Sequence, residues 1–141
     1  MPNVQFFSED VCFQIKNPVH ISQWLSNAVE NEGLTCGEIS IIFTSDDYLL
    51  KINQDHLNHD YYTDIITFDY VENQVVSGDL FISLDRVNDN ADSLNVSSEH
   101  ELNRVMVHGV LHLCGYGDKT KEEKLLMRKK EDFYLSLHSQ N

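Results

Sequence analysis

The sequence predicts an α+β domain in which helices pack on a small mixed β-sheet. Two observations lead to this class. Short runs of β-branched and aromatic residues alternate along the chain with longer segments whose apolar residues recur at helical spacing. The length of 141 residues and the hydrophobic content of 41% suffice for one buried core. We therefore expect a single domain spanning residues 1–141.

The predicted strands are short segments rich in β-branched and aromatic side chains. They are Val4–Phe7, Val11–Ile15, Glu38–Thr44, Thr63–Asp69 and Gly78–Leu84. We expect the last two to be neighbours in the sheet, because only a short polar turn at residues 72–74 separates them.

Helical spacing of apolar residues predicts five helices. The first follows Pro18 and stops at Gly33, the second is capped by Ser45, and a third runs from Asp85 to Leu94. Two further helices follow capping boxes, at Ser98–Glu101 and Thr120–Glu123. The last helix is expected to bury five side chains, namely Leu125, Leu126, Phe133, Tyr134 and Leu137.

A candidate metal site lies at the end of the fourth predicted helix. His108 and His112 are four residues apart, which places them on one helix face about 6 Å apart along the axis. Gly115 is expected to end the helix in a left-handed conformation, so that the chain turns back and brings Asp118 to the imidazoles. Two imidazoles, one carboxylate and an open fourth position form the ligand set of a catalytic zinc site. The alternative is a histidine pair that only forms hydrogen bonds in the core, which needs neither the turn nor Asp118.

Other candidate ligands are discounted. Cys114 falls about 200° from His112 around the helix and is expected to be a small core residue, while Glu101 is roughly 10 Å from His108 along the axis. Four histidines outside this stretch are also discounted, namely His20, His56, His59 and His138. Two aspartates at predicted strand starts are expected to accept backbone hydrogen bonds, Asp64 and Asp79.

The spacing of the site also resembles that of the metzincin proteases, His-x3-His-x2-Gly-x2-Asp. In those enzymes a glutamate follows the first histidine and acts as general base. Here that position is Gly109, which has no side chain to take a proton. A peptidase is therefore the less favoured interpretation.

A second resemblance retains this glycine. The YbeY endoribonuclease family, metal-dependent ribosomal RNA maturation factors, carries His-Gly-x-Leu-His-Leu-x-Gly-Tyr-Asp-His, and residues 108–118 read His-Gly-Val-Leu-His-Leu-Cys-Gly-Tyr-Gly-Asp. Two positions differ, because Gly117 replaces the aspartate of the family and Asp118 replaces its third histidine. Aspartate binds zinc at about the same bond length, so the site is expected to survive this exchange.

Two further segments extend the resemblance. The family pattern Thr-Asp-x-x-[Ser/Thr]-Phe matches residues 63–68, and Gly-Asp-[Ile/Leu]-x-Ile matches residues 78–82. Family members commonly place an arginine six residues before that threonine, as a proposed RNA-contacting or catalytic group. Leu57 stands at this position here.

The resemblance implies a four-stranded sheet with the metal-binding helix lying across it. It also implies a zinc-dependent endoribonuclease, specific for single strands, that acts in late 16S ribosomal RNA processing and ribosome quality control. His108, His112 and Asp118 would then hold one Zn²⁺, and the histidines would act in catalysis through the water on the ion, although other divalent transition metals accept the same ligands. The implied partners are RNA and the small ribosomal subunit. The rival interpretation is a ribosome assembly factor that keeps the metal for stability and cleaves nothing.

The charge distribution restricts where RNA would bind. The formal net charge of −13 argues against broad binding to a phosphate backbone. Six basic and two acidic residues leave residues 119–130 at +4, so the remainder carries −17. Four of the basic residues are expected to contact RNA, namely Lys119, Lys121, Lys124 and Arg128. The alternative is a solvated helix face held by charge pairs at i to i+4 spacing.

We expect the protein in the cytoplasm. Its three cysteines are an odd number without close spacing, which indicates reduced thiols. Residues 1–10 lack the basic region and apolar run of a signal peptide, and no apolar run is long enough to cross a membrane.

Overall fold

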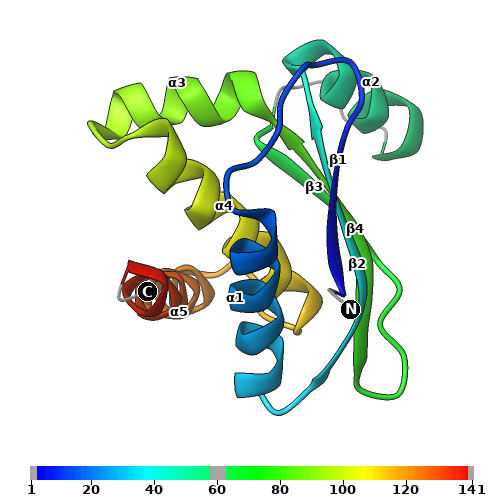
Figure 1. The fold of residues 1–141 in the computed structure, drawn as a ribbon, viewed down its shortest axis with the longest axis vertical. Coiled ribbons are helices and arrows are strands. Elements are labelled where there is room, and N and C mark those ends of the chain that lie inside the picture. Colours follow the sequence, from blue (N-terminus) through cyan, green and yellow to red (C-terminus); the bar gives the residue numbers. More distant parts are fainter. Residues whose placement is uncertain (1–2, 58–62, 140–141) are drawn as a thin grey trace.

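The computed structural model describes residues 3–57 and 63–139, and within them it contains four strands and five helices (Figure 1). The strands are β1 (Val4–Ser8), β2 (Thr35–Thr44), β3 (Ile65–Asp69) and β4 (Val75–Ser83). The helices are α1 (Pro18–Asn31), α2 (Asp46–Leu57), α3 (Leu84–Leu94), α4 (Ser98–Leu113) and α5 (Lys121–Ser139). The predicted α+β class is confirmed.

The sheet has the order β1-β2-β4-β3 and is mixed. Strands β1, β2 and β4 run parallel, and β3 pairs antiparallel with β4. The predicted pairing of these last two strands as neighbours is thus confirmed. The turn between β3 and β4 contains Asn73 and Gln74 at φ angles of 53° and 66°. Such a left-handed two-residue turn matches the natural twist of a hairpin.

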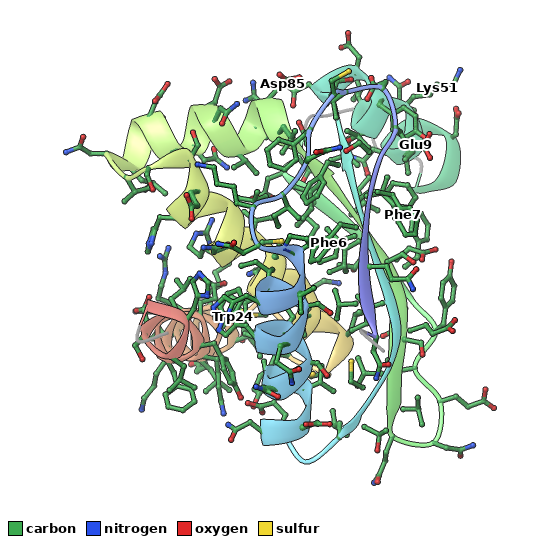
Figure 2. The ribbon with its side chains drawn as sticks, in the orientation of Figure 1. Phe6, Phe7, Glu9, Trp24, Lys51 and Asp85 are labelled. Carbon is green, nitrogen blue, oxygen red and sulfur yellow. The ribbon has the colours of Figure 1, made fainter. Side chains whose placement is uncertain are left out.

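Helices α1 and α4 cover one face of the sheet, and α5 lies beyond them (Figure 1). In Figure 2, Phe6 of β1 lies on the helix side, where it packs against the core, whereas Phe7 points to the opposite side and is exposed. Helix α4 contacts both β3 and β4 and therefore lies across the sheet, as expected. Within the described ranges, no helix has the length and apolar character needed to span a membrane.

Gly109 allows α4 to lie close to the sheet. A Cβ atom added at Gly109 would lie 2.6 Å from Cδ1 of Ile65 and 3.0 Å from a methyl carbon of Leu80. A side chain at residue 109 would therefore collide with the core side chains beneath α4.

The predicted strand Val11–Ile15 is wrong, because this segment forms a loop. The loop is held by other contacts: the Ser8 hydroxyl donates to the carbonyl of Phe13 (2.6 Å), and the Phe13 ring packs edge-on against Phe43. Asp10 accepts hydrogen bonds from the backbone N–H and the hydroxyl of Ser45. The alternating apolar residues Val11, Phe13 and Ile15 pack against the core, but their backbone pairs with no described strand.

The capping predictions are confirmed at two helices. The Ser45 hydroxyl accepts from the N–H of Tyr48 at the start of α2 (3.2 Å). At α5, the Thr120 hydroxyl accepts from the N–H of Glu123 (3.0 Å), and the Glu123 carboxylate accepts from the N–H of Thr120 (2.9 Å). This reciprocal pair is a capping box.

Two other local predictions are wrong. The N-cap of α4 is Ser97 rather than Ser98, because the Ser97 hydroxyl accepts from the N–H of His100 (3.0 Å). Asp79 lies inside β4 rather than at its start, and it accepts from the phenol of Tyr70 (3.2 Å).

The predicted buried face of α5 is also wrong, except for Tyr134. The other four side chains are 38–64% exposed, namely Leu125, Leu126, Phe133 and Leu137. The helix instead buries Met127, Glu131 and Tyr134, which are spaced four and three residues apart. The prediction considered apolar residues only, whereas glutamate is almost never fully buried unless it is paired.

Candidate metal centre

The side chains of His108, His112 and Asp118 converge at the end of α4. Oδ2 of Asp118 lies 3.4 Å from Nε2 of His108 and 3.2 Å from Nε2 of His112. All three ligand atoms lie within 4.8 Å of one another. A tetrahedral zinc ion with bonds of about 2.0–2.2 Å places its ligands about 3.3–3.6 Å apart. The three residues that the sequence selected are therefore spaced as ligands of one ion.

The turn after α4 brings Asp118 to the histidines. Gly115 has a φ of 110°, its N–H donates to the carbonyl of His112 (3.0 Å), and the N–H of Tyr116 donates to the carbonyl of Leu111 (3.1 Å). These two bonds form a Schellman motif, which reverses the chain at a glycine.

The partners of the two Nδ1 atoms show which nitrogens are available to a metal. Nδ1 of His112 lies 2.9 Å from the carbonyl oxygen of Tyr116, and Nδ1 of His108 lies 2.5 Å from Oε2 of Glu131. Because a carbonyl and a carboxylate only accept, each neutral ring carries its hydrogen on Nδ1. Two bare Nε2 atoms then face the Asp118 carboxylate with no hydrogen between them, an arrangement that a bound cation stabilises.

Glu131 is the site residue that sequence reasoning missed. Its side chain is 3% exposed, and its Oε1 atom accepts from the guanidinium of Arg104 (3.1 Å). Burial alone would raise the pKa of the Glu131 carboxyl, but His108 and Arg104 outweigh burial and hold that pKa below its ordinary value. Nothing in the spacing of α5 distinguishes this glutamate from the solvated ones around it.

The discounted ligands lie outside the cluster. Glu101 is fully buried and binds Arg104 through both oxygens. Burial, together with the charges of Glu32 and Cys36, raises the pKa of Cys114 to about 12, so its thiol stays protonated at neutral pH. The rings of His20 and His138 pack together. His59 lies outside the described residues, as does the side chain of His56.

Asp64 directly precedes β3, and charges at the site act on its carboxyl. Burial raises the pKa of its carboxyl, and the charges of His108 and Arg104 act in the opposite direction. The carboxyl also accepts a hydrogen bond from its own backbone N–H, in line with the predicted role. Leu57 is the last residue of α2, and its side chain lies outside the described part of the chain.

The site is open on the side of Asp118. The Asp118 side chain is 42% exposed, against 18% for His108 and 23% for His112. An ion held by these three residues would thus keep a fourth position accessible to water or to a ligand. Gly117 borders this opening, and a Cβ atom there would lie 2.8 Å from the carboxyl carbon of Glu123. An aspartate at position 117 would therefore displace the Glu123 carboxylate that caps α5.

The predicted RNA-contacting residues extend from Asp118 onto α5. All four are exposed, namely Lys119, Lys121, Lys124 and Arg128. Lys124 and Arg128 are spaced seven and three residues before Glu131, which places them on the helix side that faces α4. Neither forms an ion pair with another described residue, so these two side chains are solvated without the i to i+4 charge pairs of the alternative interpretation.

Comparisons with known proteins agree with the resemblance seen in the sequence. The profile of a family described as Endoribonuclease YbeY matches residues 6–138. An Endoribonuclease YbeY of Cytophaga hutchinsonii is 50% identical over 133 residues, covering 94% of this chain and 93% of the relative. An Endoribonuclease YbeY of Flavobacterium psychrophilum is 48% identical over 131 residues, covering 93% of this chain and 94% of the relative. The solution structure of TM1509 from Thermotoga maritima aligns with a TM-score of 0.66 at 26% identity, covering 96% of this chain and 88% of that one.

Proposed function

Because the chain belongs to the Endoribonuclease YbeY family, we propose that it is a zinc-dependent endoribonuclease that cleaves single-stranded RNA. The enzyme would act in the cytoplasm, in late 16S ribosomal RNA processing and ribosome quality control. Its partner would be the small ribosomal subunit, and residues 1–141 would act as one domain. The family supports the RNA substrate. The convergence of His108, His112 and Asp118 is the single observation that supports the metal.

The donor set suits a catalytic ion. When bound, zinc lowers the pKa of a coordinated water toward neutrality and polarises a phosphoryl oxygen. His108 and His112 would hold it through neutral Nε2 atoms, and Asp118 would contribute one negative charge. The exposed side of Asp118 leaves room for a phosphodiester to approach.

The basic residues at the start of α5 would orient the RNA. Lys119 follows Asp118 directly, and Lys124 and Arg128 lie on the side of α5 that also carries Glu131. Since the rest of the chain is strongly acidic, a phosphate backbone would be attracted to this region and repelled elsewhere.

The peptidase interpretation has no support from the structure. Position 109 is a glycine, and a Cβ atom there would lie 2.6 Å from Cδ1 of Ile65 and 3.0 Å from Cδ1 of Leu80, so the core leaves no room for a glutamate. No protein base is thus available at the position that metzincins use.

The proposal is tested by incubating the purified protein with a single-stranded ribosomal RNA fragment and with the same sequence in a duplex. We expect cleavage of the single strand only, loss of cleavage with a chelator, and recovery when zinc is added. A His112→Gln variant should remain folded and inactive. An intact single strand after incubation with zinc-loaded protein would contradict the proposal and favour the assembly factor.

A further inference from the structure

A buried charge cluster connects α4 and α5 behind His108. Arg104 binds both oxygens of Glu101, at 2.9 and 2.5 Å, and also donates to Oε1 of Glu131 at 3.1 Å. Glu101 and Glu131 are 0% and 2% exposed. Two buried carboxylates thus share one guanidinium, and only Glu131 also contacts a histidine of the candidate metal centre.

The two oxygens of Glu131 serve different donors. Oε1 faces the guanidinium of Arg104, and Oε2 lies 2.5 Å from Nδ1 of His108. Arginine donates and never accepts, so Oε1 is fixed by Arg104, and this leaves Oε2 as a pure acceptor aimed at the imidazole. Nδ1 of His108 must then donate, and its Nε2 atom stays bare on the side of His112 and Asp118.

We propose that Glu131, anchored by Arg104, is a positioning residue that holds His108 in the Nδ1-protonated tautomer with Nε2 aimed at Asp118 and His112. This inference rests on the proposed function, since the purpose of a bare Nε2 is to bind the ion. Carboxylate partners of this kind orient histidine ligands in metal sites and strengthen metal binding. His112 achieves the same orientation through the Tyr116 carbonyl, which no side chain substitution removes.

The variant Glu131→Gln tests the proposal because an amide has only one acceptor oxygen. That oxygen stays with the charged Arg104, so the NH2 group faces Nδ1 of His108. Because this NH2 group donates, Nδ1 of His108 can keep the hydrogen bond only as an acceptor. The hydrogen of the neutral imidazole is then on Nε2. The measurement is two-dimensional ¹H–¹⁵N NMR of the imidazole rings in the metal-free protein at about pH 9, where histidine side chains are neutral. The His108 signals are assigned with a His108→Ala variant.

Glu101→Gln is the matched control, because Glu101 is equally buried and bound to the same arginine but has no contact with His108. We expect the hydrogen of His108 on Nδ1 in the wild type and in Glu101→Gln, and on Nε2 in Glu131→Gln. In a competition assay with a colorimetric chelator, zinc affinity should fall roughly 10–100-fold in Glu131→Gln and remain within about 3-fold in the control. Equal effects of the two variants, or an unchanged tautomer in Glu131→Gln, would overturn the proposal.

The wild-type spectrum tests the proposal even if both variants fail to fold. A hydrogen on Nε2 of His108 in the metal-free wild type would refute the role of Glu131. A wild type with a bare Nε2 that binds no zinc or leaves RNA intact would instead refute the proposed function and leave the orientation of His108 by Glu131 supported.

Discussion

The phenol of Tyr116 donates a 2.5 Å hydrogen bond to Glu32, and this contact joins the turn of the metal centre to the end of α1. Tyr134 and Lys130 of α5 bind the same carboxylate. Burial would raise the pKa of Glu32, but these three hydrogen bonds outweigh burial and hold that pKa below its ordinary value. Glu32 therefore stabilises the fold in its ionised form.

The first prediction concerns the pH dependence of this stabilisation. A carboxyl whose pKa is lowered by folding contributes stability above its unfolded pKa, and that contribution is lost as the pH falls through the folded value. Glu32→Gln should lower the free energy of unfolding by about 1–3 kcal/mol at pH 7 and by much less near pH 3. Urea unfolding at both pH values measures this, and an equal loss at both would refute the role of the charge.

The second prediction concerns Gly109. Gly109→Glu would place a carboxylate against Ile65 and Leu80, so we expect a loss of several kcal/mol in unfolding free energy and no peptidase activity. The control is Leu125→Glu at a position that is 64% exposed, where the change should be about 0.5 kcal/mol or less. Thermal unfolding and a casein digest measure both effects. A stable Gly109→Glu protein that digests casein would contradict the packing described for α4.

The third prediction concerns the RNA path along α5. Lys124→Gln and Arg128→Gln should raise the KM for single-stranded RNA and leave kcat nearly unchanged. Each should reduce the slope of log affinity against log salt by about 0.7. Lys129→Gln is the control, because Lys129 is exposed but lies about 160° around the helix from Glu131. Equal effects of all three variants would mean that the basic residues of α5 attract RNA through their total charge, without a defined binding path, and would contradict the prediction.

The fourth prediction concerns the exchange of the third histidine for Asp118. A carboxylate ligand leaves less positive charge at the ion than an imidazole does, so the coordinated water should be less acidic. Asp118→His should therefore shift the pH–rate profile for RNA cleavage to lower pH while one zinc per chain is retained. Coincident profiles for the two proteins would refute this effect of the ligand charge.

The three candidate ligands were predictable because they lie within one local motif. The spacing of His108 and His112 and the glycine that reverses the chain at residue 115 depend on helix geometry alone. Glu131 was not predictable, because its burial depends on Arg104, which lies in another helix. The side of α5 that faces the core carries Glu131 between Met127 and Tyr134, so the periodicity of apolar residues alone does not identify it.

Elemental analysis of the wild type beside Asp118→Ala shows whether His108, His112 and Asp118 bind a catalytic zinc ion. Both preparations are then incubated with single-stranded RNA. We expect about one zinc per chain in the wild type, with the metal and the cleavage lost together in the variant. Zinc retained by Asp118→Ala, or a wild type without metal that still cleaves RNA, would contradict this expectation.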